Sequence, residues 1–170
     1  MVWTVDTWVL ATANGEPTAL ETVACQGFLL SLLADDSVAL SPVAEHEYHR
    51  SALVRDKEGY QTFALWWFAQ IVKRLVYPPA GGEAEAGLAR ALRESLPPGV
   101  THFDPDDIPF VVLCYRTDDR HLISGDIGEG DFCEALTAWL HADYTICFHD
   151  LQYSEPYHGA RHACTRPDEC

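Results

Sequence analysis

Four acidic residues of this chain stand at positions where a shared metal site can be built. Asp6 and Asp126 each follow a short apolar segment typical of a β-strand, and Asp107 lies in the first turn of a predicted helix. Each aspartate has a structural explanation by itself, because aspartate is common in turns after strands and complements a helix dipole. Together with Glu47 they are the candidate catalytic and metal-binding residues.

Glu47 is the most informative of the four. At about 100° per residue it falls within roughly 40° of Val43 and Val54 on the helical wheel, on the side expected to be apolar. A carboxylate on an apolar stripe is unfavourable unless it is paired or bound to a cation. Glu45 lies on the opposite, solvated side. We therefore expect Glu47 to face a binding site.

Four carboxylates brought together repel one another and raise each other's pKa values. A divalent cation relieves this repulsion, and Mg²⁺ and Mn²⁺ prefer carboxylate oxygens and water as ligands. Such a site can make hydroxide from bound water and neutralise charge that develops on a phosphoryl group. The chemistry inferred from these residues is hydrolysis of a phosphodiester bond.

The elements that must position these acids alternate between strand and helix, which predicts an α/β fold with a mostly parallel sheet and right-handed crossovers. In such a sheet, ligands bind beyond the carboxyl ends of the strands, where Asp6 and Asp126 are expected. The predicted strands are residues 2–5, 38–40, 121–124 and 144–148, and the predicted helices are residues 19–33, 41–56, 60–77, 83–96, 104–117 and 129–140.

The predicted helix over residues 60–77 has two apolar stripes. One contains Phe63 and Trp67, and the other contains Phe68 and Val72. A helix that is apolar on two faces is buried twice. We expect its second face to pack against another chain.

The composition describes one globular domain. The 170 residues include 48% hydrophobic residues and have a net charge of −15, without the basic footprint of a free nucleic-acid binder. No apolar run is long enough for a membrane span, and the first residues lack the basic region of a signal peptide, so we expect a cytoplasmic protein without membrane attachment. Residues 1–150 form the predicted domain, and residues 151–170 a polar, flexible tail.

Two alternative sites deserve consideration. A cluster in the tail could bind zinc, although its spacing matches no standard zinc finger. Alternation along one strand would place Cys147 and His149 on the same face, beside Asp150, but Cys147 is expected to point into the core. The tail cluster consists of His158, His162, Cys164 and Cys170.

The sequence resembles the PIN-domain family at four motifs in order. Residues 5–10 read Val-Asp-Thr-Trp-Val-Leu, similar to the family's opening Asp-Thr/Ser-Asn-Val-Leu, and residues 44–48 resemble its second motif, an acid and an aromatic residue on a helix. Residues 106–114 resemble the third, an acid that opens a helix. Residues 122–126, with Asp131 and Phe132, resemble the fourth.

The resemblance implies a three-layer α/β/α sandwich with a central parallel sheet. It also implies a Mg²⁺- or Mn²⁺-dependent endoribonuclease with an RNA substrate, in a family where many members are toxins of toxin–antitoxin pairs. The implied metal ligands are Asp6, Glu47, Asp107 and Asp126. An antitoxin-like protein or a second copy of the chain is then the expected partner for the exposed stripe of residues 60–77.

One departure from the family pattern favours an alternative function. Trp8 stands where the family has a small polar residue, and it lies on the same side as Asp6 if the strand continues. A tryptophan there would fill space that a metal or phosphate needs. The alternative is a catalytically inactive PIN-like module that acts as a protein-interaction domain.

Overall fold

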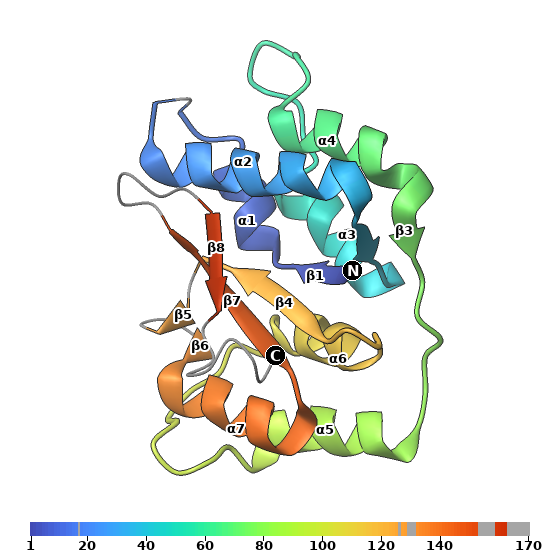
Figure 1. The fold of residues 1–170 in the computed structure, drawn as a ribbon, viewed down its shortest axis with the longest axis vertical. Helices are drawn as coiled ribbons and strands as arrows, with labels where there is room; N and C mark the ends of the chain where they lie inside the picture. Colours follow the sequence, from blue (N-terminus) through green and yellow to red (C-terminus); the bar gives the residue numbers. More distant parts are fainter. Residues whose placement is uncertain (17, 126, 129–131, 153–158, 163–170) are drawn as a thin grey trace.

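The structure is a computed structural model that describes residues 1–16, 18–125, 127–128, 132–152 and 159–162 (Figure 1). Its central sheet has six strands in the order β3-β2-β1-β4-β7-β8. The first five are parallel and β8 is antiparallel to β7. With helices on both sides of the sheet, this is the α/β/α sandwich expected from the sequence.

The strands of the main sheet are short. Its two central strands lie side by side because Thr4 pairs in register with Leu122. A separate pair, β5 and β6, runs parallel beside the sheet. The strands are β1 (Val2–Val5), β2 (Ser37–Ala39), β3 (Leu75–Val76), β4 (His121–Ser124), β5 (Ile127–Gly128), β6 (Phe132–Cys133), β7 (Cys147–Gln152) and β8 (Gly159–His162).

Within the described part of the chain, seven α-helices surround the sheet. Figure 1 shows α1, α2 and α4 on one side and α5, α6 and α7 on the other. The helix α3 contacts both α1 and α6, so it joins the two layers. The helices are α1 (Thr7–Thr12), α2 (Leu20–Asp35), α3 (Pro42–Ser51), α4 (Phe63–Ile71), α5 (Glu83–Glu94), α6 (Ile108–Tyr115) and α7 (Glu134–Tyr144), with a short 3₁₀ helix, η1 (Val72–Arg74).

The hydrophobic core lies on both faces of the sheet. Among its fully buried large side chains are Trp67 of α4, Tyr48 of α3 and Phe148 of β7. Trp67 donates a hydrogen bond from Nε1 to the carbonyl oxygen of Leu29, at 2.6 Å, which ties α4 to α2. Within the described residues, no helix has the length and apolar character needed to cross a membrane.

The predicted long helix over residues 60–77 is wrong at both ends. The helix α4 covers only residues 63–71, and the chain then forms η1 and enters the sheet as β3. Residues 75–76 form a strand instead of continuing the helix because they pair with β2 at the sheet edge. Sequence periodicity does not predict such pairing. Part of the second apolar stripe is left uncovered, since Val72 is 53% exposed.

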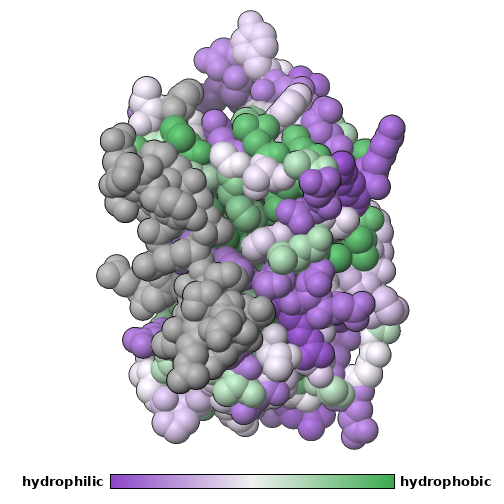
Figure 2. Space-filling view, in the orientation of Figure 1, coloured by the Kyte–Doolittle hydropathy of each residue, from purple (hydrophilic) through white to green (hydrophobic). Residues whose placement is uncertain are grey.

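Exposed apolar residues also lie on α2. Leu30 is 46% exposed and Val23 is 37% exposed. Figure 2 shows apolar residues gathered on this face, over α2 and α4. The predicted interface therefore has exposed apolar residues, and the binding of another chain to them stays a prediction.

Two further expectations are corrected. The strand β1 does not continue past Asp6, because α1 begins at Thr7. Residues 159–162 of the predicted flexible tail form β8, which pairs with β7. The first strand ends at this point because Asp6 caps α1. Residues 159–162 form a strand because the edge of β7 would otherwise be unpaired.

The hydrogen bond between Trp67 and Leu29 gives a stability prediction. Replacing Trp67 by Phe removes the indole donor and leaves a cavity, so we expect the free energy of unfolding in urea to fall by about 2–4 kcal/mol. Trp66→Phe is the matched control, because Trp66 is 37% exposed and its substitution should change stability by less than about 0.5 kcal/mol. Equal losses in both variants would contradict this account of the α2–α4 contact.

Candidate functional site

The candidate site lies where the strand order changes direction. From β1 the chain goes outward to β2 and β3, and it then returns to β4 on the other side of β1. The carboxyl ends of β1 and β4 are therefore adjacent at a topological switch point, the usual binding crevice of an open α/β sheet. The backbone N–H of Asp6 donates to the carbonyl oxygen of Ile123 at 2.9 Å, which fixes Asp6 at this edge.

Asp6 is a buried carboxylate with defined partners. It is 6% exposed, and Ser124 donates its hydroxyl to Oδ2 at 2.6 Å. The backbone N–H of Trp8 donates to Oδ1 at 3.2 Å, so Asp6 is also the N-cap of α1. The predicted placement of Asp6 is confirmed, and Ser124 orients it. The strand pattern by itself gives Ser124 no role beyond ending β4.

Tyr48 connects three elements behind Asp6. Its buried hydroxyl donates to the carbonyl oxygen of Val5, and its ring stacks on Phe110 of α6 with centroids 5.9 Å apart. Burial, and then the negative charge of Asp6, raises the pKa of the phenol, so it remains a protonated donor. Tyr48 thus holds α3 and α6 against the end of β1.

Glu47, next to Tyr48 on α3, is paired with protein groups. Arg50 Nη2 lies 2.8 Å from its Oε2, and Ser51 donates to its Oε1 at 2.7 Å. The hydrogen bond from Arg50 is the main reason that the pKa of Glu47 is lowered, so this carboxyl is ionised at neutral pH. The same guanidinium reaches Asp106, at 3.8 Å.

The prediction that Glu47 lies on a buried apolar stripe with Val43 and Val54 is wrong. Val43 and Val54 are 58% and 41% exposed, so they form no buried stripe; the buried residues of α3 are Ala44 and Tyr48. The helix turns its Tyr48 side toward Val5, because a large aromatic ring gains more from burial than two valines. Glu47 lies at the border of the buried side.

Asp107 is the N-cap of α6 and is partly buried. Its carbonyl oxygen accepts from the N–H of Phe110 at 3.0 Å, the residue that stacks on Tyr48. The stacking of these two rings brings the start of α6 toward α3, and Arg50 spans the gap to Asp106. The structure thus brings Glu47 near Asp106 through Arg50, and Tyr48, the neighbour of Glu47, reaches the end of β1.

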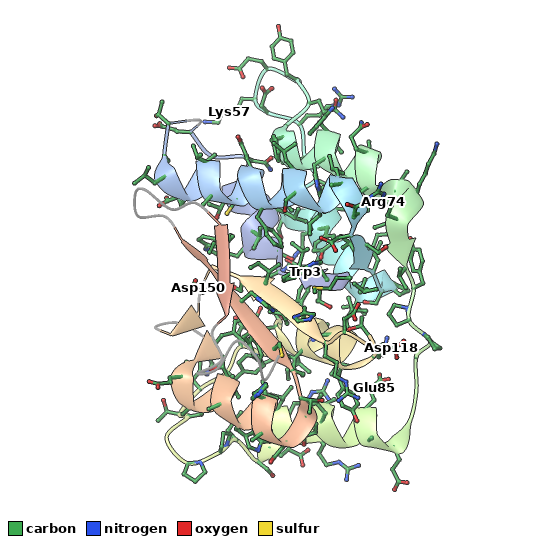
Figure 3. All side chains as sticks on the ribbon, viewed as in Figure 1. Trp3, Lys57, Arg74, Glu85, Asp118 and Asp150 are labelled. Carbon is green, nitrogen blue, oxygen red and sulfur yellow. The ribbon has the colours of Figure 1, made fainter. Side chains whose placement is uncertain are left out.

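The fourth predicted ligand, Asp126, lies outside the described residues, as does Asp131. Within the described part of the chain, no three side chains of His, Cys, Asp or Glu come close enough together to hold a metal ion. Asp150 of β7 is an acid at this edge that the predicted ligand set omitted. It pairs in register with Ser124 and lies two residues before the end of β7 (Figure 3).

Trp8 covers the end of β4. A Cβ atom built on Gly125 would lie 1.9 Å from Cζ3 of the Trp8 ring, so the indole rests directly on the glycine backbone. Because α1 begins at Thr7, helix geometry rather than strand alternation brings the ring there. The side chain does occupy space beside Asp6, as the alternative function requires.

The structure describes the side chains of only one of the two alternative sites. Cys147 Sγ lies 3.9 Å from Nδ1 of His141, while Nε2 of His149 lies 2.7 Å from Nδ1 of His121. Cys147 and His149 therefore have different neighbours, and a Cys–His–Asp triad does not follow from their shared strand. The side chains of the predicted zinc cluster lie outside the described residues.

Three comparisons with known proteins were made: no family model, no curated protein and no solved structure matches this chain.

The contact between Trp8 and Gly125 gives a prediction by double-mutant cycle. Gly125→Ala inserts a methyl group into the indole ring, and we expect a loss of about 1–3 kcal/mol in the free energy of unfolding. In a Trp8→Ala background the same change should be nearly neutral, which gives a coupling of about 1–2 kcal/mol. Gly27→Ala is the control, because no atom lies within 4 Å of its added Cβ. Additive effects would show that the ring is elsewhere.

Proposed function

We propose that this protein is a divalent-metal-dependent endoribonuclease of the PIN-like type. The observation that supports it best is the buried carboxylate of Asp6 at the switch point between β1 and β4, oriented by Ser124. Acids with further ligand positions come from α3 and from the start of α6. The proposed substrate is the RNA phosphodiester bond, because the proposed set of carboxylates would suit metal-assisted phosphoryl chemistry.

The described donors do not fit a metal by themselves. Glu47 binds Arg50 and Ser51, and an ion would have to replace Arg50 there. The proposed ligand set includes Asp126, which lies outside the described residues. We therefore assign no reaction step to the metal. What the described residues do is hold a buried charge: Ser124 fixes the direction of the Asp6 carboxylate, and Tyr48 fixes the backbone before it.

Charge limits how the proposed enzyme would bind RNA. With a net charge of −15, the protein repels a polyanion, so we propose weak, salt-sensitive binding or basic contacts from a partner. The exposed apolar residues of α2, α4 and η1 are the proposed contact for that partner, an antitoxin-like protein or a second copy.

A second candidate function is a non-catalytic interaction module. The indole of Trp8 over Gly125 favours it, because the ring takes space beside Asp6 that a phosphate would need. The pairing of Glu47 with Arg50 favours it as well, since the acid is already neutralised by the protein.

The nuclease proposal predicts cleavage that depends on metal and on Asp6. Wild-type protein should cleave a mixed RNA in Mn²⁺ but not in EDTA, and Asp6→Asn and Asp126→Asn should each lower the rate by about 10²-fold or more. Asp118→Asn is the matched control, because Asp118 is exposed and precedes β4 at the opposite edge of the sheet. Equal cleavage by all variants would identify contamination or another site.

Trp8 separates the two candidate functions. If the indole only narrows the site, Trp8→Ser should increase the Mn²⁺-dependent rise in melting temperature and the cleavage rate, because it removes bulk beside Asp6. Trp139→Ser, on α7, controls for the loss of an indole elsewhere. No Mn²⁺ effect and no cleavage by either wild type or Trp8→Ser would support the interaction module.

A further inference from the structure

The helices α5 and α6 enclose a groove on the side of the protein away from α2 and α4. Two hollows open along it, of about 380 and 360 Å³. Both are lined by Ile108 of α6 and Arg93 of α5, so they lie next to each other. Each volume is near the lower end for ligand sites, and two adjacent hollows suit a peptide segment better than one small molecule.

The two walls of the groove are formed by residues of α5 and α6. Glu85, Ala89 and Arg93 stand at successive turns of α5, over about 12 Å. The opposite wall includes Pro109 and Val112 of α6. Figure 3 shows Glu85 on α5, on the side toward α6.

The first hollow is mainly apolar, whereas the second also has polar lining residues, Thr101 and His102. Ile108 and Val112 are buried or nearly so and form the floor of the first hollow, and Leu92 and Phe103 line the second. One carboxylate and two guanidinium groups line the first hollow, those of Glu85, Arg93 and Arg116.

The cation at the junction of the hollows is available for a partner. Glu85 and Arg116 form an ion pair with each other. Arg93 is exposed and makes no ion pair with the residues that the structure describes. In a chain of net charge −15, an exposed arginine between two apolar hollows is complementary to a carboxylate with apolar groups on both sides.

We propose that this groove binds an amphipathic helical segment of another protein, with an acidic side chain on Arg93 and an apolar side chain in each hollow. Insertion of an apolar helix face into a groove is a common mode of peptide recognition. A nucleic acid is disfavoured, because the carboxylate of Glu85 lines the groove and only two aromatic rings, those of Phe103 and His102, are among the described lining residues. This binding does not depend on the proposed nuclease activity.

The test is a selection of peptides from a displayed random 16-residue library on the wild-type full chain. Selected peptides are then synthesised with a fluorophore, and their affinities are measured by anisotropy for the wild type and for variants. We expect sequences with an acidic residue flanked by apolar residues at helical spacing. Arg93→Glu should weaken their binding by at least about tenfold, since it replaces attraction by repulsion.

Matched substitutions on the same helix control for charge and for bulk. Arg90→Glu makes the same charge change outside the groove lining and should leave the affinity within about twofold. Ala89→Arg fills the first hollow and should abolish binding, whereas Ala86→Arg, at an exposed position outside the lining, should not. Melting temperatures identify a variant that does not fold, and Arg93→Glu, at an exposed position, still tests the proposal if Ala89→Arg fails.

Four results would overturn the proposal. Selected peptides could be basic, or could bind Arg93→Glu and Arg90→Glu equally. Light scattering could show a dimer that Ala89→Arg dissociates, which would assign the groove to a second copy. A labelled oligouridylate could bind with the same dependence on Arg93, which would make the ligand RNA.

Discussion

The hydrogen bond from Tyr48 to the carbonyl oxygen of Val5 is the contact on which the arrangement of the site depends. A carbonyl at the end of β1, where the chain turns into α1, has no further strand partner, and an unpaired buried carbonyl costs about 1–3 kcal/mol. The phenol satisfies it, and burial keeps that phenol protonated by raising its pKa. The same ring stacks on Phe110, so one side chain positions the acidic residues of α3 and α6 relative to β1.

The negative charges of the candidate site are paired with hydrogen-bond donors and with an arginine of the protein itself. Ser124 and the N–H of Trp8 bind the Asp6 carboxylate, while Arg50 lies between Glu47 and Asp106. These neighbours make the acids compatible with a folded protein in the absence of an ion, because a buried carboxylate is tolerated when it is hydrogen-bonded or paired. The arrangement is also the physical reason that metal binding and an inactive module remain competing functions: any ion must compete with a guanidinium that is already in place.

The two faces of the molecule offer different surfaces. The outer layer of α2 and α4 exposes scattered apolar side chains such as Leu30 and Val72. The groove between α5 and α6 has volume, an apolar floor and a cation, Arg93, that makes no ion pair with the described residues. Apolar area alone gives little specificity, whereas a hollow with a defined charge selects its occupant. The groove is therefore the more discriminating surface.

The sequence by itself determined the α/β class, the parallel sheet and the position of Asp6, because alternating strands and helices restrict a chain to few topologies. It also identified the α3 and α6 acids, but attributed Glu47 to an apolar stripe that does not exist. Only the tertiary structure decided what surrounds those acids. Their surroundings come from other elements or from another side of a helix, and include Ser124, Tyr48 and Arg50. The Trp8 ring contacts Gly125, which lies 117 positions later in the sequence. Periodicity reports which face of one element is apolar, and it contains no information about contacts between elements.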